Sequence, residues 1–172
     1  MKRILILGNP GSGKSTLAVK LGEILGYPVI HLDKLHWQPG WVMPDDEYWE
    51  SLQPDLVGGE TWIIDGNYNR TLEMRLPYAD TILYHNYSTA ISLWRVIKRL
   101  VLNYGRNRPD MADGCPEKFD FIFIKFVLRF NHRHKIEVEE KIKKYFKGST
   151  FVEFKKPSDV KRYLDNLKAT RG

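Results

Sequence analysis

The segment Gly8 to Ser15, which reads Gly-Asn-Pro-Gly-Ser-Gly-Lys-Ser, constrains the fold more than any other part of the chain. It fits the pattern G-x-x-x-x-G-K-[ST], a glycine-rich turn that binds phosphate groups. The preceding residues 2–7 are nearly all apolar, which indicates a buried parallel strand. After the motif, apolar residues recur at helical spacing, as expected for a helix with one buried face. They are Leu17, Ala18, Leu21, Ile24 and Leu25. Since the motif requires a strand before it and a helix after it, we predict a working phosphate-binding loop.

Each part of this loop has an expected role. Glycines let the backbone turn with positive φ, and the amides at the helix N-terminus favour an anion. Lys14 is expected to reach the β- and γ-phosphates of a nucleotide, and the Ser15 hydroxyl to ligate Mg²⁺. We expect ATP rather than GTP, because no Asn-Lys-x-Asp guanine-reading sequence occurs. The predicted ATP contacts in the loop are Gly8, Pro10, Gly11, Ser12, Gly13, Lys14, Ser15 and Thr16.

The rest of the chain alternates strand and helix patterns, which predicts an α/β fold with a parallel sheet and right-handed crossovers. We expect three layers, a five-stranded sheet with helices on both faces, in a single domain over residues 1–172. The predicted strands are 3–7, 29–32, 61–64, 81–84 and 150–154. The predicted helices are 14–25, 45–57, 70–75, 88–104 (capped by Ser88), 119–146 (interrupted near Asn131) and 157–167, with irregular chain over 34–43 and an exposed loop over 105–118.

Two aspartates follow predicted strands and are candidates for the site. Asp33 ends the second strand, and Asp65 ends the third. Ligands bind beyond the carboxyl ends of the strands in an open parallel sheet, although an aspartate there can also be a turn or cap residue. We expect Asp33 to orient or deprotonate an acceptor. We expect Asp65 to serve Mg²⁺ together with Ser15, and Asn67 to lie beside the substrate.

Charge is divided unevenly along the chain. Residues 1–94 carry 7 Lys and Arg against 11 Asp and Glu, whereas residues 95–172 carry 20 against 10. A basic half indicates phosphates on a small substrate, a nucleic acid backbone, or merely a solvated face.

Cys115 is the single cysteine, no apolar run is long enough to span a bilayer, and we see no room for a signal peptide. We therefore expect a cytoplasmic protein without a membrane partner, and no zinc site, since the histidines lack ligand spacing.

Arginines in the basic half predict a lid over approximately residues 105–135. Arg99 lies four residues after Arg95, and Arg129 and Arg133 follow Lys125 at the same spacing, so each set would share a helix face. Phosphoryl transfer needs positive charge around the moving group and exclusion of water. We expect Arg99, Arg129 and Arg133 to close over the γ-phosphoryl group. The alternative role for these arginines is helix pairing and surface solubility.

The aromatic Trp37 either stacks on an acceptor or fills the core, and we place it among the candidate acceptor contacts.

Several of these motifs resemble the nucleoside monophosphate kinase superfamily. The segment Asp65 to Thr71 reads Asp-Gly-Asn-Tyr-Asn-Arg-Thr, and it is similar to the Asp-Gly-Phe-Pro-Arg-Thr of adenylate kinases with one residue inserted. There the aspartate serves the metal and the arginine binds the acceptor phosphate, which implies these roles for Asp65 and Arg70. The Arg95/Arg99 pair resembles the one that leads into the adenylate kinase lid, which implies a nucleotide contact for Arg95.

More narrowly, the chain resembles the adenylate-kinase-related DNA topology modulation proteins. The similar stretches are 31–37, 62–68 and 106–111, continuing through Cys115-Pro116-Glu117. This resemblance implies a P-loop NTPase fold with strand order 2-3-1-4-5, and an adenine site near Lys155 to Ser158.

We therefore expect an ATP-dependent phosphotransferase of the nucleotide or small-metabolite kinase type, acting on an unidentified small-molecule acceptor. The alternative is an ATP-binding regulatory protein associated with DNA and without kinase activity. A plain ATPase without an acceptor is a third possibility.

Overall fold

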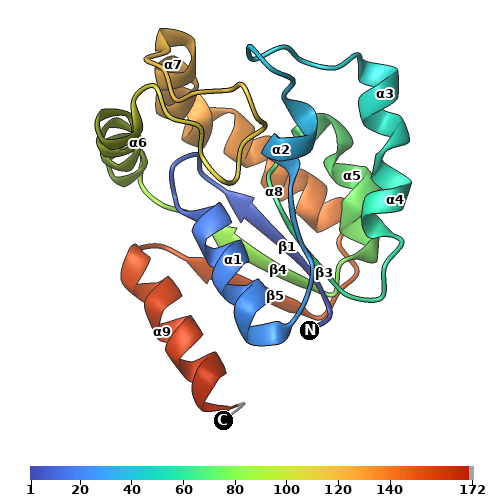
Figure 1. Cartoon of the computed structure of the whole chain (residues 1–172). Helices are drawn as coiled ribbons and strands as arrows, with labels where there is room; N and C mark the ends of the chain where they lie inside the picture. The colour runs from blue at the N-terminus through green and yellow to red at the C-terminus, as the bar shows by residue number, and fades with distance from the viewer. Residues whose placement is uncertain (171–172) are drawn as a thin grey trace.

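Five strands form one parallel sheet at the centre of the chain. The computed structural model describes residues 1–170, and its strand order is β2-β3-β1-β4-β5 (Figure 1). The strands are β1 Arg3–Gly8, β2 Val29–His31, β3 Trp62–Asp65, β4 Thr81–His85 and β5 Thr150–Phe154. All four neighbouring pairs are parallel. This confirms the predicted α/β class and the strand order that the family resemblance implied.

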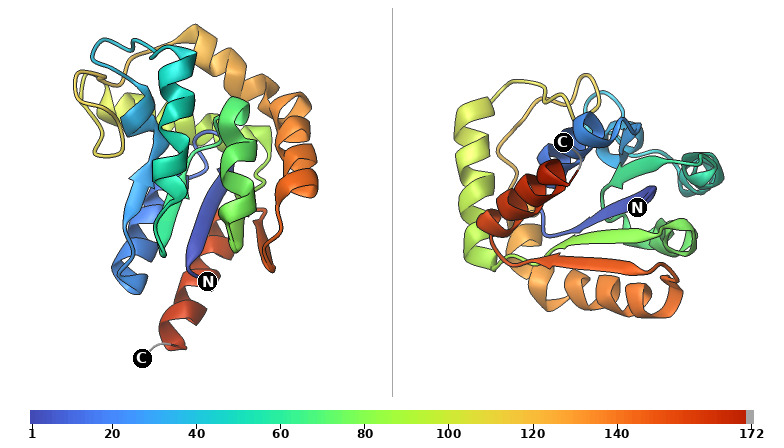
Figure 2. Two further views of the ribbon diagram at one scale, coloured as in Figure 1. Left: turned by 90° about the vertical axis from the view of Figure 1, so that its right-hand side faces the viewer. Right: turned by 90° about the horizontal axis from the view of Figure 1, so that it is seen from below.

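Helices lie on both sides of the sheet, as the two views in Figure 2 show. The α-helices are α1 Lys14–Leu25, α2 Leu32–His36, α3 Asp46–Ser51, α4 Gln53–Val57, α5 Leu72–Arg75, α6 Thr89–Asn103, α7 Phe121–Arg129, α8 His134–Tyr145 and α9 Pro157–Ala169. Short 3-10 turns occupy Asn69–Thr71, Leu76–Tyr78 and Phe130–His132. None of the helices within residues 1–170 combines the length and the apolar character needed to cross a bilayer.

Alternation along β1 divides the core into two layers. Ile4 and Ile6 face α1 and α9, whereas Leu5 and Leu7 belong to the cluster that includes residues of α3, α4, α5 and α8. All four side chains are fully buried. A strand covered on both faces is apolar throughout, which is why this segment showed no polar alternation.

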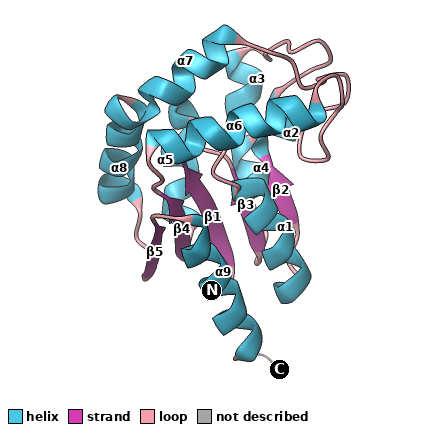
Figure 3. Cartoon of the chain, turned by 90° about the vertical axis from the view of Figure 1, so that its left-hand side faces the viewer, coloured by secondary structure: helices cyan, strands magenta, loops and turns pink. Residues whose placement is uncertain are grey.

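The carboxyl ends of the strands are covered by a separate group of elements. Figure 3 shows α6 and α7 running across this end of the sheet. Val96 and Leu100 of α6 pack against Val127 of α7 in a small cluster of their own. Ser88 caps α6 as predicted, since its hydroxyl oxygen accepts the amide of Ile91 at 3.4 Å. The phosphate-loop end of the sheet is therefore enclosed by chain from the basic half.

Three local predictions were wrong. The helix expected over 45–57 is divided into α3 and α4, because Pro54 lacks an amide and lies at the start of α4. Asp33 does not end a strand but lies in the first turn of α2. Arg133 does not share a helix with Arg129, because the 3-10 turn Phe130–His132 separates α7 from α8.

Candidate active site

The turn between β1 and α1 has the backbone geometry of a phosphate cradle. Gly8, Gly11 and Gly13 have φ values of 122°, 72° and 92°. Residues other than glycine rarely adopt positive φ values of this kind. A Cβ atom at Gly8 would lie 2.1 Å from the carbonyl oxygen of His85. Only glycine therefore lets the loop approach β4 so closely. Gly13 then caps the N-terminus of α1, where the backbone amides favour an anion.

Lys14 curls back over this loop. Its Nζ donates to the carbonyl oxygens of Gly8 at 3.1 Å and Asn9 at 2.8 Å. Burial lowers the pKa of the Lys14 ammonium, and the nearby carboxylates of Asp65 and Asp33 act in the opposite direction. The geometry thus brings Lys14, Asp33 and Asp65 together, as the sequence predicted for a nucleotide site.

Two asparagines that were not among the predicted site residues tie the loop to its surroundings. Asn9 Oδ1 accepts the amide of Tyr87 at 3.1 Å, and Asn9 Nδ2 donates to Asn131 Oδ1 at 2.7 Å. Asn131 Nδ2 in turn donates to Thr89 Oγ1 at 3.0 Å. The sequence marked Asn131 only as a helix interruption, because nothing in its neighbourhood reveals a partner 122 positions away. This network joins the loop to the turn between α7 and α8.

Arg95 and Asn67 brace the loop from opposite sides. Arg95 Nε donates to the Gly11 carbonyl at 2.9 Å. The Asn67 amide pairs with the backbone of Gly8 in both directions, since Oδ1 accepts the Gly8 amide at 2.8 Å and Nδ2 donates to the Gly8 carbonyl at 2.9 Å. Arg95 and Asn67, which were predicted as nucleotide and substrate contacts, therefore also stabilise the conformation of the phosphate loop.

Replacing Asn67 by alanine should lower the free energy of unfolding by about 2 kcal/mol, because two backbone groups of Gly8 lose their partners. ATP affinity should fall as well, since Gly8 begins the loop. Urea unfolding and calorimetric titration measure the two effects. Asn166→Ala on the exposed side of α9 is the control. Unchanged stability in Asn67→Ala would show that water replaces the amide at no cost.

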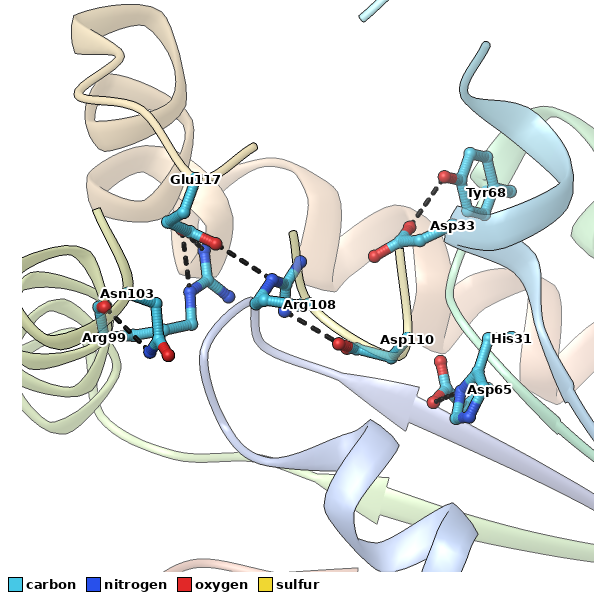
Figure 4. Close-up of polar contacts among 9 residues, drawn as sticks. All are labelled: His31, Asp33, Asp65, Tyr68, Arg99, Asn103, Arg108, Asp110 and Glu117. Carbon is cyan, nitrogen blue, oxygen red and sulfur yellow. Dashed lines mark hydrogen bonds and ion pairs between the residues drawn. The ribbon is translucent and has the colours of Figure 1, made fainter. Parts of the chain in front are cut away.

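Asp33 lies opposite the loop with a tyrosine as its partner. The Tyr68 hydroxyl donates to Asp33 Oδ1 at 2.7 Å (Figure 4). Burial raises the pKa of Asp33, and the Tyr68 bond and the more distant Arg108 offset part of this effect. A carboxylate with a raised pKa is better suited to accept a proton than an ordinary surface aspartate. Tyr68 has φ 40°, a left-handed conformation that is rare for a bulky residue. Strained backbone conformations of this kind cluster at functional sites.

Arg75 was missed by sequence reasoning and supports this turn. Its guanidinium is fully buried and donates to the carbonyl of Asn67 and to Thr71 Oγ1, both at 2.8 Å, and also to Gln53. Burial lowers the pKa of Arg75 to about 9. An arginine in a sequence ordinarily indicates a surface position, so only the tertiary structure reveals this role.

Asp65 pairs with a histidine at the ends of β2 and β3. His31 Nδ1 lies 2.8 Å from Asp65 Oδ2, and Asp65 is 3% exposed. The hydrogen bond to Asp65 raises the pKa of His31, although burial acts against it. Ser15 at the start of α1 and the buried Asp65 carboxylate provide the oxygen donors that Mg²⁺ prefers. Within residues 1–170 no three His, Cys, Asp or Glu side chains gather into a cage.

The His31–Asp65 pair should make stability depend on pH. Because the folded protein raises the pKa of His31, the pair stabilises fully below the ordinary value of 6.5 and this contribution is lost as pH rises through the raised pKa. We expect His31→Asn to cost about 2 kcal/mol near pH 5.5 and clearly less near pH 9. Urea unfolding across this range checks it, with the exposed His132→Asn as the control. A stability gap that is independent of pH would contradict it.

The predicted lid arginines have two different environments. Arg99 donates to Glu117 through Nε at 2.9 Å and through a terminal nitrogen at 2.8 Å. Arg108 Nε donates to the same carboxylate at 2.9 Å, and Arg108 also binds Asp110 at 3.1 Å (Figure 4). Burial lowers the pKa of Arg99, and Glu117 is only 5% exposed. One buried carboxylate therefore gathers two arginines beside the loop.

Arg129 and Arg133 are exposed, and within residues 1–170 neither makes an ion pair. They flank Asn131, which is bonded to the phosphate loop through Asn9. Their closure over a γ-phosphoryl group stays a prediction.

Arg70 differs from the free acceptor clamp that the family resemblance implied. Its side chain is 52% exposed and forms ion pairs with Asp46 and with Glu50, the latter at 3.1 Å. Both partners belong to α3, which follows the irregular segment after α2. The sequence alone did not reveal this pairing, because the three residues meet only through the fold.

Trp37 lies where the segment after α2 contacts the loop after α6. Trp37 and Trp41 pack against Met111, Ala112 and Cys115. Two hydrogen bonds reinforce the contact, from the Gly40 amide to the Gly114 carbonyl at 2.9 Å and from Trp41 Nε1 to the Pro116 carbonyl at 3.2 Å. The loop after α6 is thus attached to the segment after α2, so these loops form one cover.

A cavity of about 110 Å³ lies on the other side of the phosphate loop. Its lining includes Arg95, Thr16, His85 and Pro157 at the start of α9. Burial lowers the pKa of His85 to about 3, so this wall of the cavity is neutral. The cavity adjoins the stretch where the family resemblance implied an adenine site.

Sequence comparison finds a relative for part of the chain. The chain is 35% identical over 89 residues to adenylate kinase 2 from Synechocystis, covering 40% of this chain and 49% of that protein. The chain thus spans about half the length of the curated relative that it matches.

Solved structures resemble the whole chain. A shikimate kinase from Bacteroides thetaiotaomicron matches with a TM-score of 0.55 and 14% identity, over 99% of this chain and 98% of that one. The shikimate kinase from Acinetobacter baumannii, solved with shikimate, matches with a TM-score of 0.59 and 12% identity, over 99% and 96%. At these identities the likeness establishes the fold, which is that of a P-loop kinase. A family model described as an AAA domain, AAA_18, matches residues 4–109, more than half of the chain, and the protein therefore belongs to that family.

Proposed function

We propose that this protein is an ATP-dependent phosphotransferase that acts on a small hydroxylated acceptor. The observation that carries the proposal is the arrangement of Lys14 over the phosphate loop, with Asp33 and Asp65 beside it. Phosphoryl transfer is catalysed by positioning and by electrostatic stabilisation, and these three groups supply both. The identity to an adenylate kinase over part of the chain adds support.

The residues divide the work as follows. The loop amides and Lys14 hold the ATP phosphates, and Arg95, which lines the cavity beside α9, contacts the nucleotide. Ser15 and Asp65 are the residues that would hold Mg²⁺, which when bound neutralises charge on the phosphates. Asp33 orients the acceptor hydroxyl and takes its proton. Arg99, Arg129 and Arg133 exclude water and stabilise the charge on the moving phosphoryl group.

We propose that residues 105–135 act as the lid of this kinase, within a single domain. The joint between Trp37, Trp41 and the loop around Cys115 implies that the segment after α2 moves together with the lid. We also propose that the chain shares its lineage with the DNA topology modulation proteins, on the stretches quoted above.

Turnover of γ-labelled ATP tests the function. The protein is incubated with Mg²⁺, ATP and each of a panel of nucleosides, nucleotides and small hydroxylated metabolites. Products are detected by mass. We expect ADP release to depend on one class of acceptor, with a product heavier by one phosphoryl group. ADP release at one rate with and without every acceptor would indicate a plain ATPase instead.

No specific contact favours the alternative of a DNA-associated regulator. Several basic residues of the second half are already paired with carboxylates, among them Lys141 with Glu73 and Arg162 with Asp159. Duplex DNA binding measured against salt separates the two functions, because neutralisation of many phosphates gives a steep salt dependence. We expect no such dependence.

A further inference from the structure

Arg70 and Arg108, two arginines beside the candidate acceptor region, are already paired with carboxylates. Arg70 is paired with Asp46 and Glu50 on the surface. Arg108 is paired with Asp110 and Glu117. A phosphomonoester is bound in proteins by arginines that pair with it bidentately. Here those positions already have carboxylate partners.

Among the arginines of residues 1–170 without a carboxylate partner, Arg106 is exposed in the loop after α6, and Arg129 and Arg133 lie toward the nucleotide. Arg129 and Arg133 flank Asn131. The Asn131 amide contacts Asn9 in the phosphate loop and Tyr87 and Thr89 after β4. Since β1 separates β4 from β3 and β2 in the sheet, this position lies across the phosphate loop from Asp33 and Asp65. These arginines therefore serve the ATP side.

Three carboxylates lie near the place of the acceptor, and Asp33 is the one that forms no ion pair among the described residues. Asp33 has a neutral phenol, Tyr68, as its hydrogen-bond partner, and Asp65 lies beyond it at the end of β3. Asp110, on the loop after α6, turns its carboxylate toward Arg108 (Figure 4). A doubly charged phosphate placed among these groups would be repelled, and like charges brought together in this way are a strong source of discrimination.

A wall of uncharged aromatic rings next to Asp33 consists of the partly exposed Tyr68 and His36, with the buried Trp49 packed against them. The Tyr68 ring lies 4.5 Å from His36 and 5.0 Å from Trp49, between ring centroids. His36 also meets Trp37 edge to face at 5.3 Å. Burial lowers the pKa of His36, so this wall carries no charge at neutral pH. Such a wall favours a flat or cyclic ligand that presents a hydroxyl group to Asp33.

We propose that the phosphoryl acceptor is an uncharged cyclic compound with a free hydroxyl group, of the nucleoside or cyclic polyol type, and not a phosphomonoester. This inference rests on the proposed kinase function. In the reaction the acceptor O–H bond breaks and its proton passes to the Asp33 carboxylate. The acceptor oxygen forms a bond to the γ-phosphorus of ATP. The bond from that phosphorus to the β-phosphate oxygen breaks, and its electron pair leaves with ADP.

Matched pairs of compounds test the inference. Each pair consists of a neutral compound and its phosphomonoester: adenosine and AMP, thymidine and TMP, ribose and ribose 5-phosphate, inositol and inositol monophosphate. Transfer from γ-labelled ATP is measured by mass, and tryptophan fluorescence reports binding near Trp37 and Trp49. We expect the neutral member of the accepted pair to have a kcat/KM at least about tenfold higher than its phosphomonoester.

A charge variant gives a second readout. Asp110→Asn releases Arg108 from one carboxylate, so the preference for the neutral member should narrow severalfold, through tighter binding of the phosphomonoester. Asp113→Asn changes the same charge in the same loop at an exposed position and should leave the preference unaltered. An unaltered preference in Asp110→Asn would overturn the electrostatic argument.

The outcomes separate the inference from the function beneath it. Equal or faster transfer to the phosphomonoesters overturns the inference and leaves the kinase assignment intact. Transfer to neither member of any pair, with ATP bound in a manner that depends on Lys14, overturns both.

Discussion

Replacing Lys14 by alanine should lower kcat for phosphoryl transfer by about 10² to 10³-fold, or about 3–4 kcal/mol of transition-state stabilisation. The ammonium group lies over the phosphate loop, within hydrogen-bond distance of the Gly8 and Asn9 carbonyls. Under the proposed function, this ammonium group stabilises the negative charge that develops between the β- and γ-phosphates. Steady-state kinetics with the accepted compound measures this loss.

The control for Lys14 is a lysine of equal charge outside the site. Lys98 lies exposed on α6 and is suitable, so Lys98→Ala should retain near wild-type kcat. Unfolding in urea should show that Lys14→Ala remains folded, since the hydrogen bonds of Lys14 Nζ are those to the carbonyls of Gly8 and Asn9 in the described structure. A Lys14→Ala enzyme with full transfer activity would contradict the proposed function.

Replacing Asp33 by asparagine should lower kcat by about 10²-fold or more, because a positioned general base contributes a factor of this order or larger. Asparagine preserves the shape and can still accept the Tyr68 hydroxyl, but it cannot take a proton from the acceptor. Since burial raises the pKa of Asp33, wild-type kcat should also fall as pH drops through that raised pKa. This acid limb should be absent in Asp33→Asn.

Asp55→Asn provides the matched control for Asp33, since Asp55 is exposed on α4. ATP binding, measured by calorimetry, should be nearly unaffected in Asp33→Asn, because the carboxylate serves the acceptor and not the nucleotide. If Asp33→Asn lowered ATP affinity and left kcat unchanged, Asp33 would be a nucleotide ligand and not the base.

Much of the local structure could be predicted because it depends on neighbours in the sequence. The apolar run before Gly8 and the periodicity after Lys14 gave β1 and α1, and Ser88 gave the start of α6. The strand order, by contrast, came from the family resemblance, since parallel neighbours are far apart along the chain. The short helix α2 and the break at Pro54 were missed, because such short elements carry little periodic signal.

The candidate site was predictable only as far as residue type implies chemistry. The phosphate loop follows from a motif and Asp65 from the end of β3, whereas Asp33 was selected as a strand end and lies in the first turn of α2; the fold brings the three together. The hydrogen-bond partners of these residues could not be predicted from the sequence. Tyr68 for Asp33, His31 for Asp65 and Asn67 for Gly8 are chosen by the meeting of separate loops.

By itself, the sequence determined that a phosphate loop joins a buried strand to a helix, because glycine torsions and apolar periodicity are local properties. Only the tertiary structure decided which charges remain free. It paired Arg70 with α3, gathered Arg99 and Arg108 on Glu117, and buried Arg75 under the Asn67 turn. The physical reason is that an ion pair depends on distance in space and on burial, and neither quantity is fixed by separation along the chain.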